Sequence, residues 1–447
     1  MSSAKNKALL LLAKSATTGA LGGLLFGFDT AVIAGVTHSL SLQYHLSDSQ
    51  LGFTVAIALI GTVIGALTSG ILGQRIGSRA ALRVMGVLYV LSALGCAFAG
   101  SWGMFLAFRF LGGLGIGGSS VLGPVYIAEL APAKWRGRLV GLFQINIVIG
   151  ILLAYLSNAI IARFALGSIE WRVQLGVAVF PAILFLLLLL SVPHSSRWLV
   201  SQNRIDEAQI ILARMGSPDS KAEVDAIVES LRFEGGLEQH SIFNRRYALP
   251  VFLAISIGLF NQLSGINAIL YYLNDIFASA GFSSVSSNTQ AVGIGLANLA
   301  GTAIGISIID KLGRKTLLLI GSVGTCLCLA GVAWVFATNS HLKLLLPLLV
   351  VFIAFFAASQ GAVIWVYLSE VFPTNVRSKG QSLGSSSHWI MNAAIAWTFP
   401  IIARHSRALP FAFFASMMVV QFLTVYFVYP ETKGYSLEEM HQHIGAH

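Results

Sequence analysis

Two ionisable side chains stand inside long apolar runs of this sequence, where a charge is costly. Asp29 lies in the run 14–38 and Arg109 in the run 104–128. An unpaired charge near the centre of a bilayer costs about 2.5–3.5 kcal/mol on insertion scales, so we expect the two side chains to pair. The pair could simply hold two helices together. Alternatively, its carboxylate could bind and release a proton as the arginine departs and returns.

Amide and aromatic side chains form a second polar set within the apolar runs. Several of them surround Gly265, which can let a helix unwind, as the binding helices of transporters typically do. Amides both donate and accept hydrogen bonds, which suits a neutral polyhydroxylated ligand such as a sugar. The simpler alternative is that single amides join helices by hydrogen bonds. The set comprises Gln144, Asn261, Gln262, Asn267, Tyr271, Asn298, Trp365, His388, Trp389 and Asn392.

A charged cassette occurs twice, once in each half of the chain, with matching order and similar spacing. The first copy is Gly70–Arg79 followed by Glu129–Gly137, and the second is Asp310–Lys315 followed by Glu370–Arg377. Repeated order of this kind indicates a duplicated architecture. In membrane transporters such duplication builds two bundles that rock around a central site.

The elements that must position these residues are membrane-spanning helices. Hydrophobic residues make up 56% of the chain and charged residues 10%, whereas a soluble domain has roughly 25% charged residues. Most runs are apolar all round, which excludes a large soluble helical core with polar outer faces. Twelve runs are long enough to cross a bilayer. They are 14–38, 52–73, 81–100, 104–128, 139–162, 172–193, 248–278, 288–309, 316–338, 344–368, 381–403 and 409–429.

The placement of lysine and arginine predicts the orientation. Basic residues precede the first run and recur in alternate connections, whereas the connections 38–51, 100–104 and 279–288 contain none. The positive-inside rule therefore predicts a protein of the inner membrane with both termini in the cytoplasm. The same residues account for the net charge of +10, and without interleaved aromatic residues they do not predict nucleic-acid binding.

Other patterns predict no chemistry of their own. Gly113-x-Gly115-x-x-Gly118 matches a dinucleotide fingerprint, but no strand precedes it, so close helix packing is the better interpretation. The three cysteines lie in apolar runs, and the ten histidines lack metal-ligand spacing. No nucleophile–base pair stands out either, so the sequence predicts no enzyme, no metal site and no cofactor.

One long polar segment, 194–246, divides the chain. Apolar residues at helical spacing predict two or three short amphipathic helices there. We expect an N-terminal six-helix bundle over 1–193, a cytoplasmic helical domain over 194–246 and a C-terminal six-helix bundle over 247–430. A cytoplasmic C-terminal helix over 431–447 is predicted by the capping-box pattern Ser436-Leu437-Glu438-Glu439.

These residues and their order resemble the sugar porter family of the major facilitator superfamily, over essentially the whole chain. The resemblance rests on Gly22–Asp29, Gln262–Asn267, Pro430–Gly434 and the paired Glu-x-x-Pro-x-x-x-Arg motifs. Around Trp365 and His388 the chain particularly resembles bacterial D-xylose and glucose proton symporters. The family implies an all-α membrane protein with twelve helices in two pseudo-symmetric bundles, a small cytoplasmic helical domain, and sugar transport by alternating access.

The resemblance also implies roles for single residues. Asp29 stands where proton-coupled members carry aspartate. The acids of the repeated motifs are expected to pair with nearby bases as a cytoplasmic gate. Family sugar-contact positions are occupied here by Gln144, Gln262, Asn267, Asn298, Gly361, Trp365 and Trp389. The gate residues are Arg75, Arg79, Glu129, Arg136, Asp310, Arg314, Lys315, Glu370 and Arg377.

Several positions depart from the family pattern. Asn261 and His388 stand where close relatives often have glutamine, so the identity of the sugar stays open. In the first cassette, Gln74 replaces an aspartate and Ser78 replaces an arginine. His194 replaces the glutamate of a Pro-Glu-Ser-Pro-Arg motif. We therefore expect the gate of the first half to be the weaker one.

Three functions fit these observations. The favoured one is a proton symporter that imports a neutral pentose or hexose, with coupling through Asp29 because the run 172–193 lacks the second carboxylate of some members. A passive sugar facilitator would leave Asp29 structural. A non-transporting membrane sugar sensor would be expected to carry a long cytoplasmic tail, whereas few residues follow the last run. The expected partners are a monosaccharide, a proton and the bilayer, and the family default is a monomer.

Overall fold

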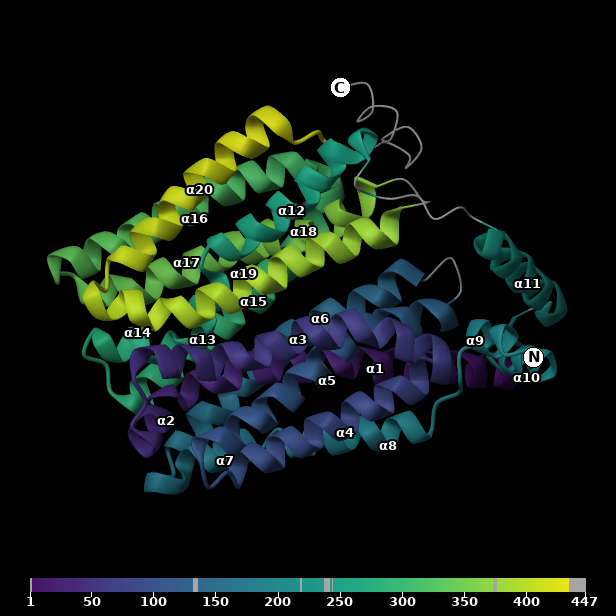
Figure 1. Ribbon diagram of the computed structural model, residues 1–447, viewed down its shortest axis with the longest axis horizontal. Coiled ribbons are helices and arrows are strands. Elements are labelled where there is room, and N and C mark those ends of the chain that lie inside the picture. Colours follow the sequence, from purple (N-terminus) through teal and green to yellow (C-terminus); the bar gives the residue numbers. More distant parts are fainter. Residues whose placement is uncertain are drawn as a thin grey trace. The chain divides into compact units, whose positions relative to one another are not determined.

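The computed structural model describes residues 2–131, 136–217, 219–236, 242, 244–372 and 376–433. Within these ranges every regular element is a helix and no strand occurs, which confirms the all-α prediction. Figure 1 labels the helices along the chain. By their internal contacts the residues form two compact units.

The first unit contains Met1–Asp29, Gly61–Ile151 and Leu175–Glu238. Its long helices coincide with apolar runs of the first half, and its short ones follow in the polar segment. Some helices continue past the limits of the unit. They are α1 (Ser2–Val32), α3 (Asp48–Ile76), α4 (Ser78–Ala97), α5 (Trp102–Leu130), α6 (Arg136–Ala162), α7 (Glu170–Gly176), α8 (Val179–Leu190), α9 (Ser196–Ser201), α10 (Ile205–Arg214) and α11 (Ser220–Gly236).

The second unit contains Thr30–Ile60, Leu152–Gln174 and Gln239–His447, so two stretches of the first half pack with helices of the second half. The predicted division into two six-helix bundles stays a prediction, and the predicted C-terminal helix lies outside the described residues. The elements are η1 (Ile33–Gly35), α2 (Thr37–Tyr44), η2 (Gly167–Ile169), η3 (Arg245–Tyr247), α12 (Ala248–Leu263), α13 (Ile266–Tyr271), α14 (Leu273–Ser279), α15 (Ser284–Leu312), α16 (Arg314–Thr338), η4 (Leu342–Leu344), α17 (Leu345–Ala358), α18 (Gln360–Glu370), α19 (Arg377–His405) and α20 (Leu409–Val428).

Eleven helical segments in the described part of the chain are long and apolar enough to cross a membrane. They correspond to eleven of the twelve predicted runs. The twelfth, 381–403, lies within the continuous helix α19, whose first half is rich in serine, glycine and histidine and is therefore less apolar. The run 248–278 is longer than the candidate span, which is Ala248–Tyr271. At about 1.5 Å per residue, this shorter span already crosses a hydrocarbon core of about 30 Å.

Two spans are interrupted where they carry polar side chains. Gly265 separates α12 from α13 in the left-handed conformation, with φ at 79°, as the sequence predicts. A side chain at this position would be strained and would also meet the ring of Phe414. Ser359, with φ at −119° and ψ at −87°, separates α17 from α18, and no pattern in the sequence indicates that break.

Small residues let the helices of the first unit approach closely. A Cβ atom added to Gly61 or Gly65 would meet the backbone oxygens of Phe110 and Leu114 on α5. The glycines of the dinucleotide-like fingerprint lie on the same helix, within a continuous α-helix that follows no strand. This confirms that the pattern serves helix packing.

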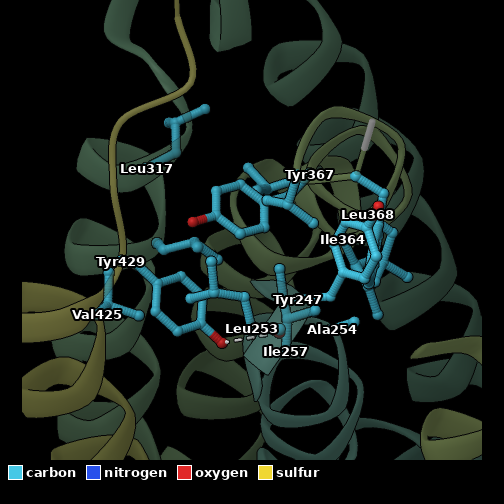
Figure 2. Close-up of a cluster of buried hydrophobic side chains, with 14 of the residues drawn as sticks. Tyr247, Leu253, Ala254, Ile257, Leu317, Ile364, Tyr367, Leu368, Val425 and Tyr429 are labelled. Carbon is cyan, nitrogen blue, oxygen red and sulfur yellow. Dashed lines mark hydrogen bonds between the residues drawn. The ribbon is translucent and has the colours of Figure 1, made fainter. Parts of the chain in front are cut away.

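A buried aromatic cluster joins the ends of α12, α18 and α20 in the second unit (Figure 2). The rings of Tyr367 and Tyr429 stack with their centroids 5.3 Å apart. The hydroxyl groups of Tyr429 and Ser256 share a hydrogen bond of 2.7 Å, and the Tyr367 hydroxyl donates to the Pro430 carbonyl at 3.2 Å. The cluster therefore anchors the segment that follows α20.

The polar segment forms the short amphipathic helices that the sequence predicts. α9, α10 and α11 pack together around Leu199, Val200, Ala208 and Val224, which are all buried. These four side chains come from three different helices and pack in one cluster. The polar segment thus has a small apolar core of its own.

Candidate transport site

Asp29 and Arg109 form the ion pair that their burial predicts. Arg109 Nη1 on α5 lies 2.7 Å from Asp29 Oδ1 on α1, inside the first unit. The arginine side chain is 4% exposed and the aspartate side chain 16%. Because Arg109 is almost fully buried, removal of its partner would leave a charge without compensation. The carboxylate retains some access, which a group that exchanges protons requires.

Amide side chains in the second unit form a continuous hydrogen-bonded chain around the helix break. Gln262 is central: its Nε2 donates to Asn261 Oδ1 at 3.2 Å, and its Oε1 accepts from Asn267 Nδ2 at 3.0 Å. Gln262 Nε2 also lies 3.2 Å from Nε2 and 3.3 Å from Nδ1 of the His388 ring. Asn261 Nδ2 contacts the carbonyl of Gln360 at 3.4 Å. The side chains are thereby held in fixed orientations before any ligand arrives.

Aromatic rings flank this amide chain on one side. The His388 ring lies 5.3 Å from the Trp365 ring and 4.9 Å from the Trp389 ring, measured between centroids. His388 and Trp389 are buried, whereas Trp365 is 37% exposed. Part of the Trp365 indole, next to the His388 ring, therefore remains accessible, which suits a ligand with both hydroxyl groups and an apolar face.

Other candidate residues of the second unit do not join the amide chain. Asn392 Nδ2 donates to the Tyr271 hydroxyl at 3.1 Å. Asn298 is buried on α15 and has no hydrogen bond to any described residue, so its amide is available to a ligand. Gly361 lies in the first turn of α18, directly after the break at Ser359.

Gln144 belongs to the first unit, on α6, and is half-buried without a hydrogen bond to the described residues. The sequence analysis did not select Gln360, which is buried beside Asn261 and has an Oε1 atom without a partner in the described structure. A glutamine in an apolar run next to Gly361 was a signal that could have identified it. Among the described residues, no three His, Cys, Asp or Glu side chains gather as metal ligands would.

Of the residues predicted for the second-half gate, Arg314 pairs with Glu370. Arg314 donates to the two carboxylate oxygens of Glu370 from Nε at 3.1 Å and from Nη2 at 2.8 Å. The Thr432 hydroxyl donates to Glu370 Oε2 at 2.6 Å, and Arg314 Nη1 also reaches Asp310 Oδ1 at 2.8 Å. Bidentate pairing between arginine and carboxylate is among the strongest polar contacts in proteins.

Glu431 adds a carboxylate that the gate prediction did not include. Its oxygens accept from the backbone N–H groups of Arg314 at 2.8 Å and of Lys315 at 3.1 Å. These two residues are the first of helix α16. A carboxylate at a helix N-terminus satisfies free donors and meets the positive end of the helix dipole. The Lys315 side chain itself donates to the Tyr426 carbonyl rather than to an acid. The side chain of Arg377 lies outside the described residues.

The first-half gate residues make different contacts. Glu129 accepts from the Ser78 hydroxyl at 2.8 Å. Arg79 donates to the Val192 carbonyl at 2.7 Å and to His194 Nε2 at 2.6 Å, so it does not reach Glu129. Arg75 is exposed, and its side chain makes no hydrogen bond or ion pair with the described residues. The side chain of Arg136 lies outside the described part of the chain.

Spanning helices, a helix break lined with amides, and a buried ion pair together define a polytopic membrane transporter for a polar solute. Residues 15–444 match the Sugar (and other) transporter family. The chain belongs to this family, and it is an integral membrane transporter rather than an enzyme.

Individual relatives support the assignment along the whole chain. The D-xylose-proton symporter of Escherichia coli is 35% identical, with 94% of this chain and 93% of the relative covered. The glucose facilitated diffusion protein of Zymomonas mobilis is also 35% identical, with 97% of each chain covered. The xylose transporter of E. coli, solved in an inward open conformation, superposes with a TM-score of 0.86 at 34% identity, covering 96% of this chain and 99% of that one.

Proposed function

We propose that this protein imports a neutral monosaccharide, a pentose or a hexose, together with a proton by alternating access. The observation that carries the proposal is the buried Asp29–Arg109 pair of the first unit, which shares no residue with the amide chain around Gln262 in the second unit. One set of residues can thus carry the proton while the other binds sugar. Relatives named for D-xylose–proton symport support both partners.

The amide chain supports a sugar as the solute. Its donors and acceptors match hydroxyl groups, and no charged side chain belongs to it, so an ionic substrate would meet no counter-charge there. A ligand hydroxyl could replace the contact between Gln262 and Asn267. The partly exposed indole of Trp365 suits the apolar face of a pyranose.

The ion pair supports proton coupling. A proton on the Asp29 carboxyl group would remove the charge that pairs with Arg109, so the binding of a proton and the breaking of the ion pair are linked. Rocking of the bundles would couple to the proton through this contact. We further propose an inner-membrane location, cytoplasmic termini, a division into two six-helix bundles with a cytoplasmic domain, and a monomeric state.

The test compares two variants in proteoliposomes supplied with labelled pentoses and hexoses, with and without an imposed pH gradient. Asp29→Asn should abolish accumulation against a gradient but retain exchange of sugar, because the amide chain stays intact. Gln262→Ala should weaken binding about tenfold or more, since an unsatisfied buried polar group costs about 1–3 kcal/mol. If Asp29→Asn still concentrates sugar, the symport mechanism is wrong.

A passive facilitator is the alternative that the comparisons keep open, because a glucose facilitated diffusion protein is as similar to this chain as the symporters are. Wild-type protein decides between the two: a facilitator equilibrates sugar at any pH gradient and never accumulates it. In that case the ion pair would serve only to hold α1 and α5 together.

A further inference from the structure

A second carboxyl group lies where the two halves of the sequence meet in the second unit. Asp275 stands on α14, beyond the candidate span Ala248–Tyr271, at the outer end by the proposed topology. α14 packs against η1, which comes from the first half of the chain. The Thr37 side chain, at the start of α2, lies close enough to the Asp275 carboxyl group to favour its charged form, and the Thr37 hydroxyl itself donates to the Ala34 carbonyl at 3.5 Å.

One carboxyl oxygen of Asp275 has no hydrogen-bond partner. Oδ2 is shielded from solvent and makes no hydrogen bond within the described structure, although the residue as a whole is half-buried. Thr37 itself is 1% exposed. Arg407 reaches the end of the same helix, where it donates to the Ser279 carbonyl at 2.7 Å. Because burial of a carboxylate oxygen without a donor is unfavourable, closure around Asp275 favours the protonated acid.

The groups around Asp275 provide little positive charge to stabilise its carboxylate. From α2 the only titratable neighbour is His38, an exposed side chain whose positive form would favour the carboxylate. On its own helix, Asp275 follows the phenol of Tyr272. The facing end of α15 carries serine, asparagine and glutamine but no charged residue. Burial raises the pKa of Asp275 to about 6, against the smaller opposing effects of Thr37 and His38.

We propose that Asp275 is a second proton-binding group of the transport cycle, which fastens the outer contact between α14 and α2 when it is protonated. The proposal rests on the proposed alternating access. When the outer contact opens, Asp275 meets water and becomes an ordinary carboxylate. External acidity would therefore favour closure on the outer side, independently of Asp29.

The direction of the pH effect follows from the linkage between protonation of Asp275 and closure of the outer contact. The Asp275 pKa is about 6 when the contact is closed, above its ordinary value of 3.8. The protonated contact is fully favoured below the ordinary value and is weakened as the pH rises through 6. Between pH 7 and pH 5, the ratio of closed to open protein should increase about tenfold.

Spin labels at Gln43 on α2 and Ala337 at the end of α16, both exposed sites, would report the outer distance. The measurement uses full-length protein in sugar-free liposomes, with the three native cysteines replaced by serine. Wild type should gain about tenfold in the short-distance population from pH 7 to pH 5. Asp275→Asn should remove this dependence, and the exposed Asp206→Asn on α10 should leave it unchanged.

Thr37→Val gives a second test that keeps the carboxyl group. Loss of the donor removes a contact that favours the charged form, so the midpoint should move to higher pH. A flat wild-type profile, or a profile that survives Asp275→Asn, would overturn the proposal.

Asp29→Asn separates this proposal from the proposed function. If Asp275 acts alone, the distance profile keeps its pH dependence in that variant even when sugar accumulation is lost. If the dependence disappears with Asp29, the second proton site does not exist. Absence of sugar transport by wild type would overturn the proposed function but would leave this distance measurement decisive.

Discussion

In each of the two repeated cassettes a helix begins directly after a glycine with positive φ, but different contacts stabilise the start of that helix. Gly77 and Gly313, with φ at 84° and 91°, precede α4 and α16. In each half, a tyrosine hydroxyl donates to a proline carbonyl: Tyr126 to Pro193 at 2.8 Å, and Tyr367 to Pro430 at 3.2 Å. The residue after each proline differs, and that difference changes the chemistry of the gate.

In the second half this residue is Glu431, which caps α16 beside the Arg314–Glu370 pair. In the first half it is His194, which stacks on Trp198 with ring centroids 4.9 Å apart and accepts from Arg79. One turn is held by charge at a helix terminus, and the other by an aromatic stack and a neutral imidazole. A shared backbone geometry therefore does not imply a shared source of stability.

The largest effect is expected from removal of the cap. Glu431→Ala would leave the N–H groups of Arg314 and Lys315 without their acceptor, and hydrogen bonds to charged groups contribute about 1.5–3 kcal/mol each. A net local loss of about 2 kcal/mol would speed hydrogen exchange in the first turn of α16 about thirtyfold. The matched variant His194→Ala should change exchange at α4 much less. Similar changes in both halves would remove the contrast between the cassettes.

A smaller effect on hydrogen exchange is expected when the pH is lowered and the first-half contact between His194 and Arg79 weakens. Burial, together with Arg79, Arg204 and Arg83, lowers the pKa of His194 to about 4 from its ordinary 6.5. The contact with Arg79 needs the neutral ring, so it is fully present above pH 6.5 and weakens as the pH falls towards 4. Because His194 is half-exposed, we expect a loss of about 1 kcal/mol at most, or about fivefold faster exchange in the first turn of α4.

The control for this titration is His194→Gln, which cannot take up a proton. After correction for the intrinsic pH dependence of exchange, this variant should give a flat profile for α4. The first turn of α16, which has no histidine contact among its described partners, should also stay flat in wild type. A matching pH response at α16 would show that the effect is not local.

The smallest effect is expected from restoration of the missing acid. Gln74 is exposed, and an exposed ion pair contributes only ~0.2–1 kcal/mol. Gln74→Asp should therefore shift the population towards the outward-open state by up to about fivefold. Accessibility of a cysteine in the outer vestibule measures this shift, with Gln74→Asn as the uncharged control. No shift, or an inward one, would show that Gln74 is not a missing gate residue.

The sequence predicted the elements well because the bilayer restricts them. Length and hydropathy determine a span locally, and the interruption at Gly265 follows from one residue type. The break at Ser359 could not be predicted, since neither Ser359 nor Gln360 is a strong helix breaker. Its geometry depends on packing between helices that are distant in the sequence.

Parts of the candidate site could be predicted from the sequence where the cost of burying a charge decides which residues must pair. Asp29 and Arg109 are paired because neither charge can be left alone in the membrane. Three contacts were missed: the cap from Glu431, the stack of His194, and the burial of Asp275 against Thr37. Each depends on the positions of side chains after folding, about which hydropathy carries no information.

Contacts within the second unit also determine when, during synthesis of the chain, this unit can be completed. Asp48, at the start of α3, lies 2.6 Å from Arg404, near the end of α19 and 356 residues later in the chain. At about 5–20 residues per second, a ribosome needs roughly 20–70 s to add that length. For that time the outer ends of the first helices stand in the membrane without their partners. Assembly of this unit is therefore complete only after α19 has been synthesised.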